Sequence, residues 1–468
     1  MGTALTIDLG KFIAGLRYDD IPKEAIPLIK IAFVDCTGVM IAGALEAAPR
    51  LLESTLAPAP GGATILFSNR NASGPDAAWI NGTAAHVLDF DDFARLGGHP
   101  SAVLVPAILA ESEIIGASGE QMLCAYAAGF ETWIELLRRD ADLHHNKGWH
   151  PTGIFGAIAA AAACASLRRL DAEQAAHAIA LAASQSAGIV ANFGTMAKSL
   201  HAGRAAHSGV VSAALAGKGF TAACDALEHP AGFLMAVSPA GNIDVESATA
   251  AGTDWKLLSN RLSIKKYPMC FATHRALDGM LDLLRSKEID AKNVRRIEVF
   301  LSRRSASILR HHAPQTALEA KFSMEFAMAC ALIERRAGLR ELTDEFVRRE
   351  DVQALMKRIV VTPMGEDRAD PMRPGFTVYD QVIVETSLGN DLDSGPITVV
   401  RGDPDCPLTP EELWTKFEDC LAAGNATVPA RKLFDSLMSL DQIRHVSEIP
   451  GLEHPNRDSS PEHHGGKE

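Results

Sequence analysis

Several patterns that mark common classes of protein are missing from this chain. Its eight cysteines are so widely spaced that no CxxC pair occurs, which excludes the usual thiolate sites for zinc and iron–sulfur clusters and disfavours a disulfide framework. There is no P-loop, no strand–GxGxxG–helix unit and no GxSxG elbow. The sequence therefore lacks the signatures of nucleotide-binding folds and of serine hydrolases.

Long basic runs and long hydrophobic runs are also missing. Lysine and arginine number 45 against 58 aspartates and glutamates, which gives a net charge of −13. This balance argues against nucleic acid or an anionic membrane as a partner, because both are bound by basic faces. Residues 1–11 lack a signal-peptide pattern, and the most membrane-like stretch, 154–167, is short and rich in alanine. We expect a cytoplasmic protein that does not bind a membrane.

The chain does have a large apolar fraction, 47% of its 468 residues, which is enough for two or three domains with ample core. In the first half, apolar residues recur at helical spacing, and the abundance of alanine and glycine allows helices to pack closely. The spacing predicts helices at 26–45, 77–87, 102–115, 119–137, 153–167, 172–187 and 205–218.

The pattern changes near residue 263. Alternation of apolar and polar residues predicts strands at 296–301, 358–362 and 380–386, separated by helical stretches at 274–287, 320–337 and 351–357. Thr409-Pro410 is typical of a helix start and opens a last helical group. The predicted fold is mostly α, with a large all-helical domain of residues 1–262 and about 405–450, a smaller α/β (α+β) domain of residues 263–404, and a disordered tail at 455–468.

Polar residues suited to acid–base chemistry gather in islands between the apolar helices. His99 follows two glycines in a turn, shortly after a cluster of aspartates. His150 precedes an alanine-rich helix, whose dipole favours the neutral imidazole that a base needs. Lys198, His201 and Arg204 bracket the predicted start of another helix and form a candidate anion clamp. Helix capping or a solvated loop is the alternative interpretation of each island.

Two further islands lie in the second half of the chain. Lys266, Tyr267 and His274 stand where the pattern changes, at a predicted domain junction of the kind where clefts form. Residues 314–323 are polar too, with a loop entering a helix as the simpler interpretation. No island has the ligand spacing of a metal site, so the residues point to general acid–base catalysis without a metal.

In their order along the chain, these islands resemble the MmgE/PrpD family, which includes 2-methylcitrate dehydratase, cis-aconitate decarboxylase and iminodisuccinate epimerase. The resemblance covers about residues 5–445 and implies a two-domain fold, a homodimer, and a cofactor-free site in the cleft between the domains. Its most specific segments are Asn81-Gly82 through Asp92, His99-Pro100-Ser101, Trp149-His150-Pro151-Thr152, Lys198-Ser199-Leu200-His201-Ala202-Gly203, Tyr267-Pro268 with His274, and Glu319-Ala320-Lys321-Phe322-Ser323.

The resemblance also implies the site residues. Those of the decarboxylase branch correspond to Asp89, His99, His150, Lys198 and Tyr267. The residues predicted to contact the substrate are Phe93, His201, Arg204, Lys266 and His274. At Phe93 the decarboxylase branch has a threonine, and where the dehydratase branch has Asp-Asn this chain has Ala102-Val103. The ring of Phe93 predicts weak activity on cis-aconitate and a preference for a less polar or differently shaped acid.

The predicted function is therefore that of a cofactor-independent lyase acting on a small di- or tricarboxylate. A neutral histidine would take a proton from the carbon beside a carboxylate, and lysine would stabilise the developing enolate charge. Dehydration of a 2-methylcitrate-like acid is the leading interpretation, with decarboxylation of a cis-aconitate-like acid and epimerisation of an iminodisuccinate-like acid as alternatives. A non-catalytic helical scaffold is the alternative of another class, and the choice between the two histidines as base stays open.

Overall fold

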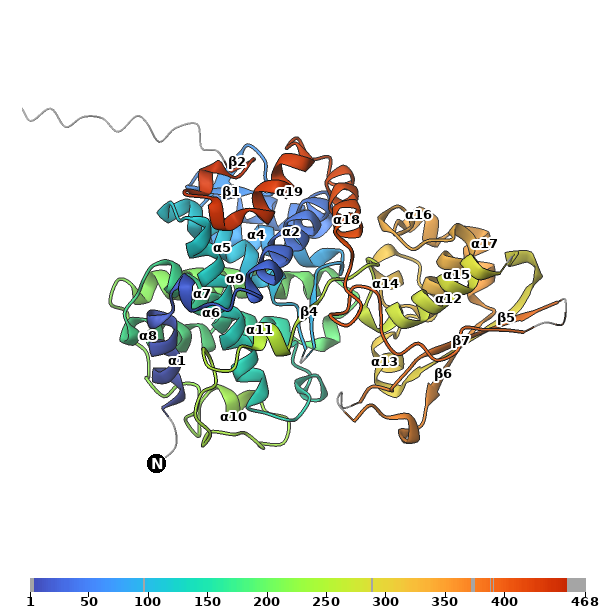
Figure 1. The fold of residues 1–468 in the computed structure, drawn as a ribbon, viewed down its shortest axis with the longest axis horizontal. Coiled ribbons are helices and arrows are strands. Elements are labelled where there is room, and N and C mark those ends of the chain that lie inside the picture. Colours follow the sequence, from blue (N-terminus) through green and yellow to red (C-terminus); the bar gives the residue numbers. More distant parts are fainter. Residues whose placement is uncertain are drawn as a thin grey trace, which may run out of the picture.

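The computed structural model describes residues 4–95, 97–287, 289–371, 375–387, 389 and 391–452, and the tail predicted at 455–468 lies outside these ranges. Helices make up the first part of the chain and a small mixed sheet lies in the later part, on the right in Figure 1. The prediction of a mostly helical protein with a smaller α/β part is confirmed. The domain boundaries at 263 and about 405 stay a prediction.

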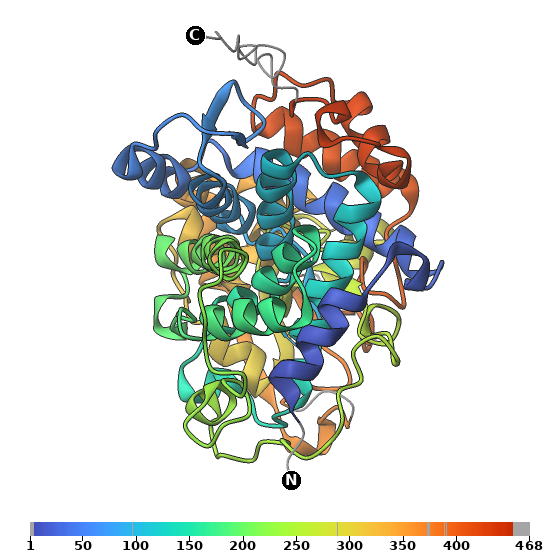
Figure 2. The same ribbon diagram turned by 90° about the vertical axis from the view of Figure 1, so that its left-hand side faces the viewer.

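The helical part is built around α7, in which every residue except Ser166 is buried. Small side chains allow this, because 151–167 contains seven alanines and two glycines among its seventeen residues. Figure 2 looks onto this layer of helices. Its main helices are α1 (Leu5–Gly15), α2 (Ala25–Gly43), α3 (Ala47–Leu56), α4 (Gly74–Val87), α5 (Ser101–Ile115), α6 (Gly119–Arg138), α7 (Pro151–Leu167), α8 (Ala172–Ala183) and α9 (Met196–Ala216).

Two glycines let α4 and α9 cross closely. A Cβ atom on Gly82 would lie 2.8 Å from the Cα of Gly203, and one on Gly203 would lie 2.2 Å from the carbonyl oxygen of Trp79. Neither distance is tolerable for a side chain, so both positions require glycine. This contact matters for function, because α4 carries His86 and α9 carries Lys198.

One helix, α2, is long and apolar enough to cross a membrane by length and composition. It is a core helix instead, because 72% of its apolar window is buried inside the protein, where it contacts α4, α5, α18 (Pro410–Ala423) and α19 (Ala430–Met438). The stretch 154–167, which the sequence marks as most membrane-like, is α7 and is likewise buried.

The sheet in the later part has the strand order β6-β5-β7-β8. β5 (Val294–Ser302), β6 (Ile359–Met364) and β7 (Gln381–Thr386) lie where the alternating patterns predict strands. β5 pairs in parallel with β6 and antiparallel with β7, and β8 (Leu392–Asp393) adds a short edge. The main helices of this part are α12 (His274–Ser286), α15 (Met324–Glu334) and α17 (Glu350–Met356). The helix predicted at 320–337 is divided, because residues 321–323 separate α14 (Ala317–Ala320) from α15, which Ser323 caps.

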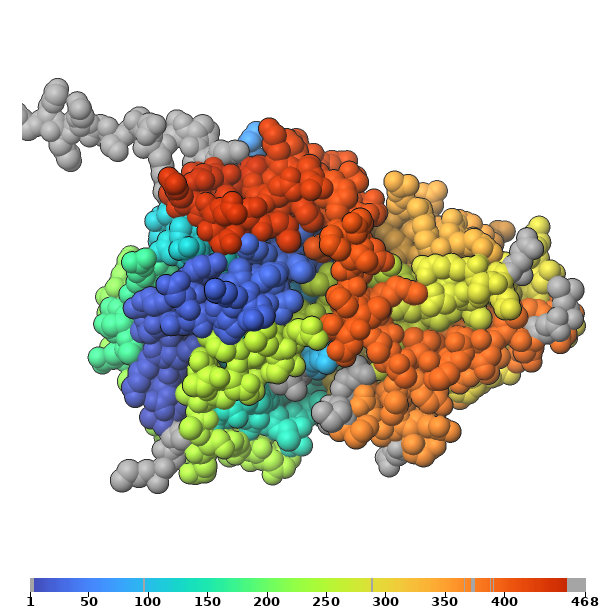
Figure 3. Space-filling view, in the orientation of Figure 1, coloured from blue at the N-terminus to red at the C-terminus, as the bar shows by residue number. Residues whose placement is uncertain are grey.

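Two connections fasten the parts together. β3 (Phe93–Ala94) pairs antiparallel with β4 (Leu262–Ser263), which joins the turn after α4 to the segment that leads into the sheet. The chain then returns, so that α18 and α19 pack on α2, seen as the red helices beside the blue one in Figure 1. In the space-filling view of Figure 3, the red surface of this returning segment lies against the blue surface of the N-terminal segment. The buried Lys416 of α18 donates to the carbonyl oxygens of Phe90 and Lys265 at 2.9 and 2.8 Å and pairs with Asp35 of α2.

Candidate active site

The turn after α4 holds an aspartate between two lysines. Asp89 has a φ of 51°, a left-handed conformation that aspartate tolerates better than most residues and that is a feature of functional sites. Lys265 donates to its carboxylate at 3.0 Å and to its carbonyl oxygen at 2.7 Å, and Lys198 of α9 pairs with the other carboxylate oxygen. Burial alone would raise the pKa of Asp89, but the two ammonium groups hold that pKa well below its ordinary value. The buried carboxylate is therefore ionised at neutral pH.

A second carboxylate, Asp91, lies between two imidazoles. Its Oδ2 is 2.9 Å from Nδ1 of His86 and 3.1 Å from Nδ1 of His99. Burial would raise the pKa of Asp91, but the two imidazoles hold it well below its usual range. Burial lowers the pKa of His86 to about 3, and it also lowers the pKa of His99 against the opposing effect of Asp91. At neutral pH both histidines are neutral, and a proton on each Nδ1 leaves each Nε2 able to accept another.

The third histidine of the cluster is His150, at the start of α7. Its ring stacks on that of His86 with centroids 5.7 Å apart, and its Nδ1 is 3.1 Å from Nδ1 of His201 on α9. Burial, followed by the nearby imidazole of His86 and the ammonium group of Lys198, lowers the pKa of His150 well below its ordinary value. His201 thus supports His150 from behind, and its own pKa is lowered by burial to about 4.

These groups surround a cavity of about 70 Å³ between the helical part and the sheet-bearing part. Five of the predicted residues line it: Asp89, Phe93, His99, His150 and Lys198. Its other polar lining residues are His145, Thr152, Lys265, Cys270 and Arg304. The cavity therefore combines ammonium groups, neutral imidazoles and one carboxylate within a buried space.

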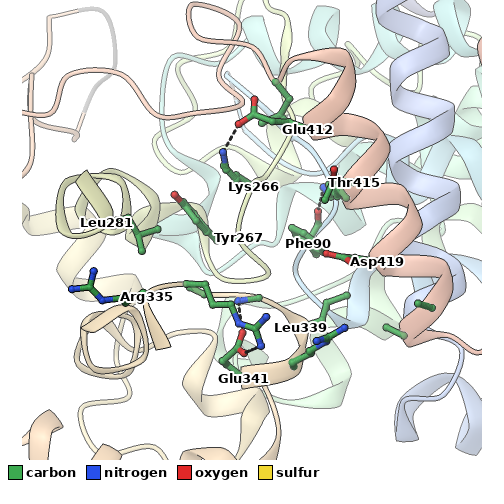
Figure 4. A pocket seen from close by; sticks show the side chains of 18 of the residues that line it. Phe90, Lys266, Tyr267, Leu281, Arg335, Leu339, Glu341, Glu412, Thr415 and Asp419 are labelled. Atoms are coloured by element: carbon green, nitrogen blue, oxygen red, sulfur yellow. Dashed lines mark hydrogen bonds and ion pairs between the residues drawn. The ribbon is translucent and has the colours of Figure 1, made fainter. Parts of the chain in front are cut away.

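Other predicted residues lie outside this cavity. Tyr267 donates its hydroxyl to Asp278 at 2.7 Å, and Lys266 pairs with Glu412. Both line a larger, second cavity of about 670 Å³ beside α18, where Figure 4 shows Tyr267 and the Lys266–Glu412 pair. Among the described residues, Tyr267 therefore lines a cavity different from the one that holds the histidine cluster.

Two more predicted contacts are placed elsewhere. The guanidinium of Arg204 lies 5.0 Å from the ring of Trp79 and contacts His207, away from the cavity. His274 is buried with Nε2 3.2 Å from the carbonyl oxygen of Met269, and burial lowers its pKa to about 3. The predicted anion clamp of Lys198, His201 and Arg204 is therefore incomplete, because only Lys198 reaches the cavity and His201 acts through His150.

The structure adds residues that the sequence did not single out as site residues. Lys265, His86, Asp91, His145 and Arg304 all lie in or directly behind the cavity lining. Lys265 had a local signal, since it precedes Lys266 in the island at the domain junction. Arg304 comes from α13 (Arg303–Ile308), far along the chain, and no local pattern connects it with the histidines.

Four of these side chains are close enough to suggest a metal ion. Ligand atoms of His86, Asp89, Asp91 and His99 lie within 4.8 Å of one another. A divalent cation here would stand beside the two ammonium groups on Asp89, and the imidazole nitrogens that face Asp91 would have to turn away from it. The donor set thus suits an internal network of ion pairs better than a metal, and a metal-free site stays our prediction.

A helical part and a small mixed sheet meet at a cavity whose histidines and buried lysines can bind a small anion and transfer protons. The MmgE/PrpD N-terminal domain matches residues 7–246 and the MmgE/PrpD C-terminal domain matches residues 267–440. The chain belongs to the MmgE/PrpD family, whose enzymes are lyases.

Among curated proteins, the chain is similar to cis-aconitate decarboxylases. It is 25% identical to that of Aspergillus terreus (strain NIH 2624 / FGSC A1156), over 96% of this chain and 95% of the relative. It is 26% identical to that of Mus musculus, over 78% and 74%, and 25% identical to that of Homo sapiens, over 73% and 71%.

Proposed function

We propose that the chain is a cofactor-independent decarboxylase of a small carboxylic acid with more than one carboxylate. The observation that carries the proposal is the single buried cavity shared by a carboxylate-backed histidine and two lysines. The names of the relatives favour decarboxylation over the dehydration that the sequence put first.

The proposed mechanism uses charge placement and proton transfer. One substrate carboxylate binds at the ammonium groups of Lys198 and Lys265, which keep further N–H donors beyond those on Asp89. The bond to a second carboxylate breaks, carbon dioxide leaves, and the electron pair moves into the carbon chain beside the bound carboxylate. The lysines stabilise that charge, and a histidine N–H supplies the proton that ends on carbon. A carboxylate is thus replaced by hydrogen.

We assign the proton transfer to His99, which takes a proton from solvent at Nε2 and delivers it to carbon, and we assign to His150 the role of a neutral hydrogen-bond donor to the substrate. Asp91 behind His99 fixes its Nδ1 proton and stabilises the imidazolium that forms when Nε2 takes a proton. His150 has only neutral His201 behind it and no carboxylate, so it stays neutral and can position a substrate carboxylate through its ring N–H. This division is our proposal for the choice between the two histidines that the sequence left open.

Incubation in heavy water with cis-aconitate, 2-methylcitrate and iminodisuccinate, followed by NMR, tests the proposal. Decarboxylation releases carbon dioxide and places deuterium on carbon, dehydration gives an alkene, and epimerisation gives exchange alone. His99→Asn and His150→Asn should each lower turnover by about 10²-fold or more. The control is His229→Asn, because His229 is exposed and outside the cavity lining. Near-normal rates in both variants would contradict the assignment, and no turnover or binding with any polycarboxylate would favour a scaffold.

We also propose that the enzyme is a cytoplasmic homodimer. The family resemblance and the many helices built of small residues support a dimer formed through the helical part. Light scattering at micromolar concentration measures the mass directly, and a stable species of one chain, 49.9 kDa, would contradict the dimer.

A further inference from the structure

The lining of the catalytic cavity has an apolar wall. Five phenylalanines face it, two from the helical part and three from the sheet-bearing part, together with Ile308. The rings of Phe93 and Phe271 are stacked, with centroids 5.2 Å apart and planes 20° from parallel. The other three are Phe193, Phe322 and Phe376.

The cations of the cavity rest against this wall. The ammonium group of Lys198 lies 5.4 Å from the ring centroid of Phe193 and 5.2 Å from that of Phe322. The guanidinium of Arg304 lies 4.6 Å from the ring centroid of Phe376. Ring faces are electron-rich, so they hold cations in place without neutralising them. The same faces are poor neighbours for a carboxylate, because they repel negative charge and offer it no hydrogen bond.

The charges in the lining limit how many carboxylates the cavity can accept. Lys198, Lys265 and Arg304 are cationic, Asp89 and the Asp91 directly behind the lining are anionic, and the histidines are neutral, so the net charge around the cavity is about +1. Two substrate carboxylates more than balance that charge. A third would stand against the phenylalanine wall with no cation left for it, and burying it there would be costly.

We infer that the substrate is a dicarboxylate that carries an apolar arm, an alkyl or aryl group lying against Phe93 and Phe271 where a tricarboxylate has its third carboxylate. This inference rests on the proposed function and adds the class of substrate to it. Phe93 is the most important ring for this inference, because it lies in β3, close to the turn that holds Asp89. Its ring also contacts that of His99 edge-on, with centroids 5.6 Å apart.

Two unreactive acids of matched skeleton test the inference by titration calorimetry. Tricarballylate has three carboxylates, and benzylsuccinate has a phenyl ring in place of one of them. Benzylsuccinate should bind the enzyme at least about 10-fold more tightly than tricarballylate. Phe93→Thr should reduce this preference to about 3-fold or less, because it replaces part of the wall with a hydroxyl. Phe220→Thr is the matched control, since Phe220 is 55% exposed and outside the cavity lining.

The outcomes separate this inference from the proposed function. If tricarballylate binds as tightly as benzylsuccinate or more tightly, and Lys198→Ala abolishes that binding, then the apolar arm is contradicted and the proposed carboxylate site is supported. No binding of either acid at millimolar concentration would overturn both. If Phe93→Thr keeps the wild-type preference for benzylsuccinate over tricarballylate, the ring of Phe93 does not contact the bound acid, and the inference is overturned. If Phe93→Thr does not fold, as judged by circular dichroism, Phe271→Thr makes the same comparison, because its ring stacks on that of Phe93 and faces the same cavity.

Discussion

Replacing Asp89 by asparagine removes one negative charge from between two buried ammonium groups and leaves the shape of the side chain almost unchanged. Asparagine tolerates the left-handed backbone at this position, so the variant isolates the charge. Asp89 is 3% exposed and pairs with Lys198 and Lys265. Removing one partner of a buried ion pair costs about 3–5 kcal/mol, because the remaining charge stays buried and unpaired.

That loss of unfolding free energy predicts a decrease in the melting temperature. At about 2.1 cal/mol/K per residue, the entropy of unfolding of 468 residues is about 1 kcal/mol/K if the chain unfolds as one cooperative unit. Asp89→Asn should therefore lower the melting temperature at pH 7 by about 3–5 °C, as measured by differential scanning calorimetry. Asp89→Ala should lower it by a further 1–2 °C or so, because alanine adds the strain of the left-handed backbone.

The pH dependence distinguishes charge from packing. The pKa of Asp89 is lowered in the folded protein, so its ionised form stabilises the fold above the unfolded pKa of about 3.9, and that contribution is lost as the pH falls through the folded pKa. The difference in melting temperature between wild type and Asp89→Asn should thus have its full size at pH 7 and decrease below about pH 4. Asp8→Asn, which breaks an exposed pair with Lys11, should change the melting temperature by about 1 °C at most. If Asp89→Asn lowers the melting temperature at pH 7 by no more than this control does, the reasoning is refuted.

Three further predictions follow from the site. Lys198→Ala should lower kcat/KM by about 10²-fold or more, and Lys198→Arg should not restore it, because the guanidinium is larger and planar; full activity in the arginine variant would contradict a fitted ammonium site. Tyr267→Phe should keep kcat/KM within about 3-fold of wild type, since its hydroxyl bonds Asp278 at the second cavity; a 10²-fold loss would return that hydroxyl to the reaction. Exhaustive chelation should leave turnover unchanged, and activity lost and then restored by one divalent cation would assign a metal to the cluster around Asp91.

Periodicity located most of the fold. Alternation at 296–301, 358–362 and 380–386 identified three strands because each has one face on the core of the sheet-bearing part. The pairing of β3 with β4 escaped prediction, since a ladder of two residues leaves no periodic signal and joins positions 93 and 263. The start of α9 was placed late, at 205 instead of Met196, because the polar residues of its first turns serve the site and break the apolar pattern.

The site was predicted in part, for geometric reasons. His99 and His150 stand just before helices in turns that the sequence makes visible, and both line the cavity. Lys265 and Lys266 are adjacent in an irregular connecting segment and point to different cavities, so sequence alone could not choose between them. Helical phase separated Arg204 from Lys198, because six residues on an α-helix turn the side chain by about 240°.

Lys416 links the active site to the order in which the protein is made. Its ammonium group donates to the carbonyl oxygens of Phe90 and Lys265 and pairs with Asp35. It is nevertheless translated some 150 residues after Lys265 and more than 300 residues after the turn that holds Asp89. On the ribosome, α1–α9 can collapse long before this lysine emerges, and the turn that carries Asp89 then lacks its anchor. The candidate site is therefore anchored only after α18 has been made, and a nonsense mutation before α18 would remove this anchor while sparing every residue that lines the cavity around Asp89.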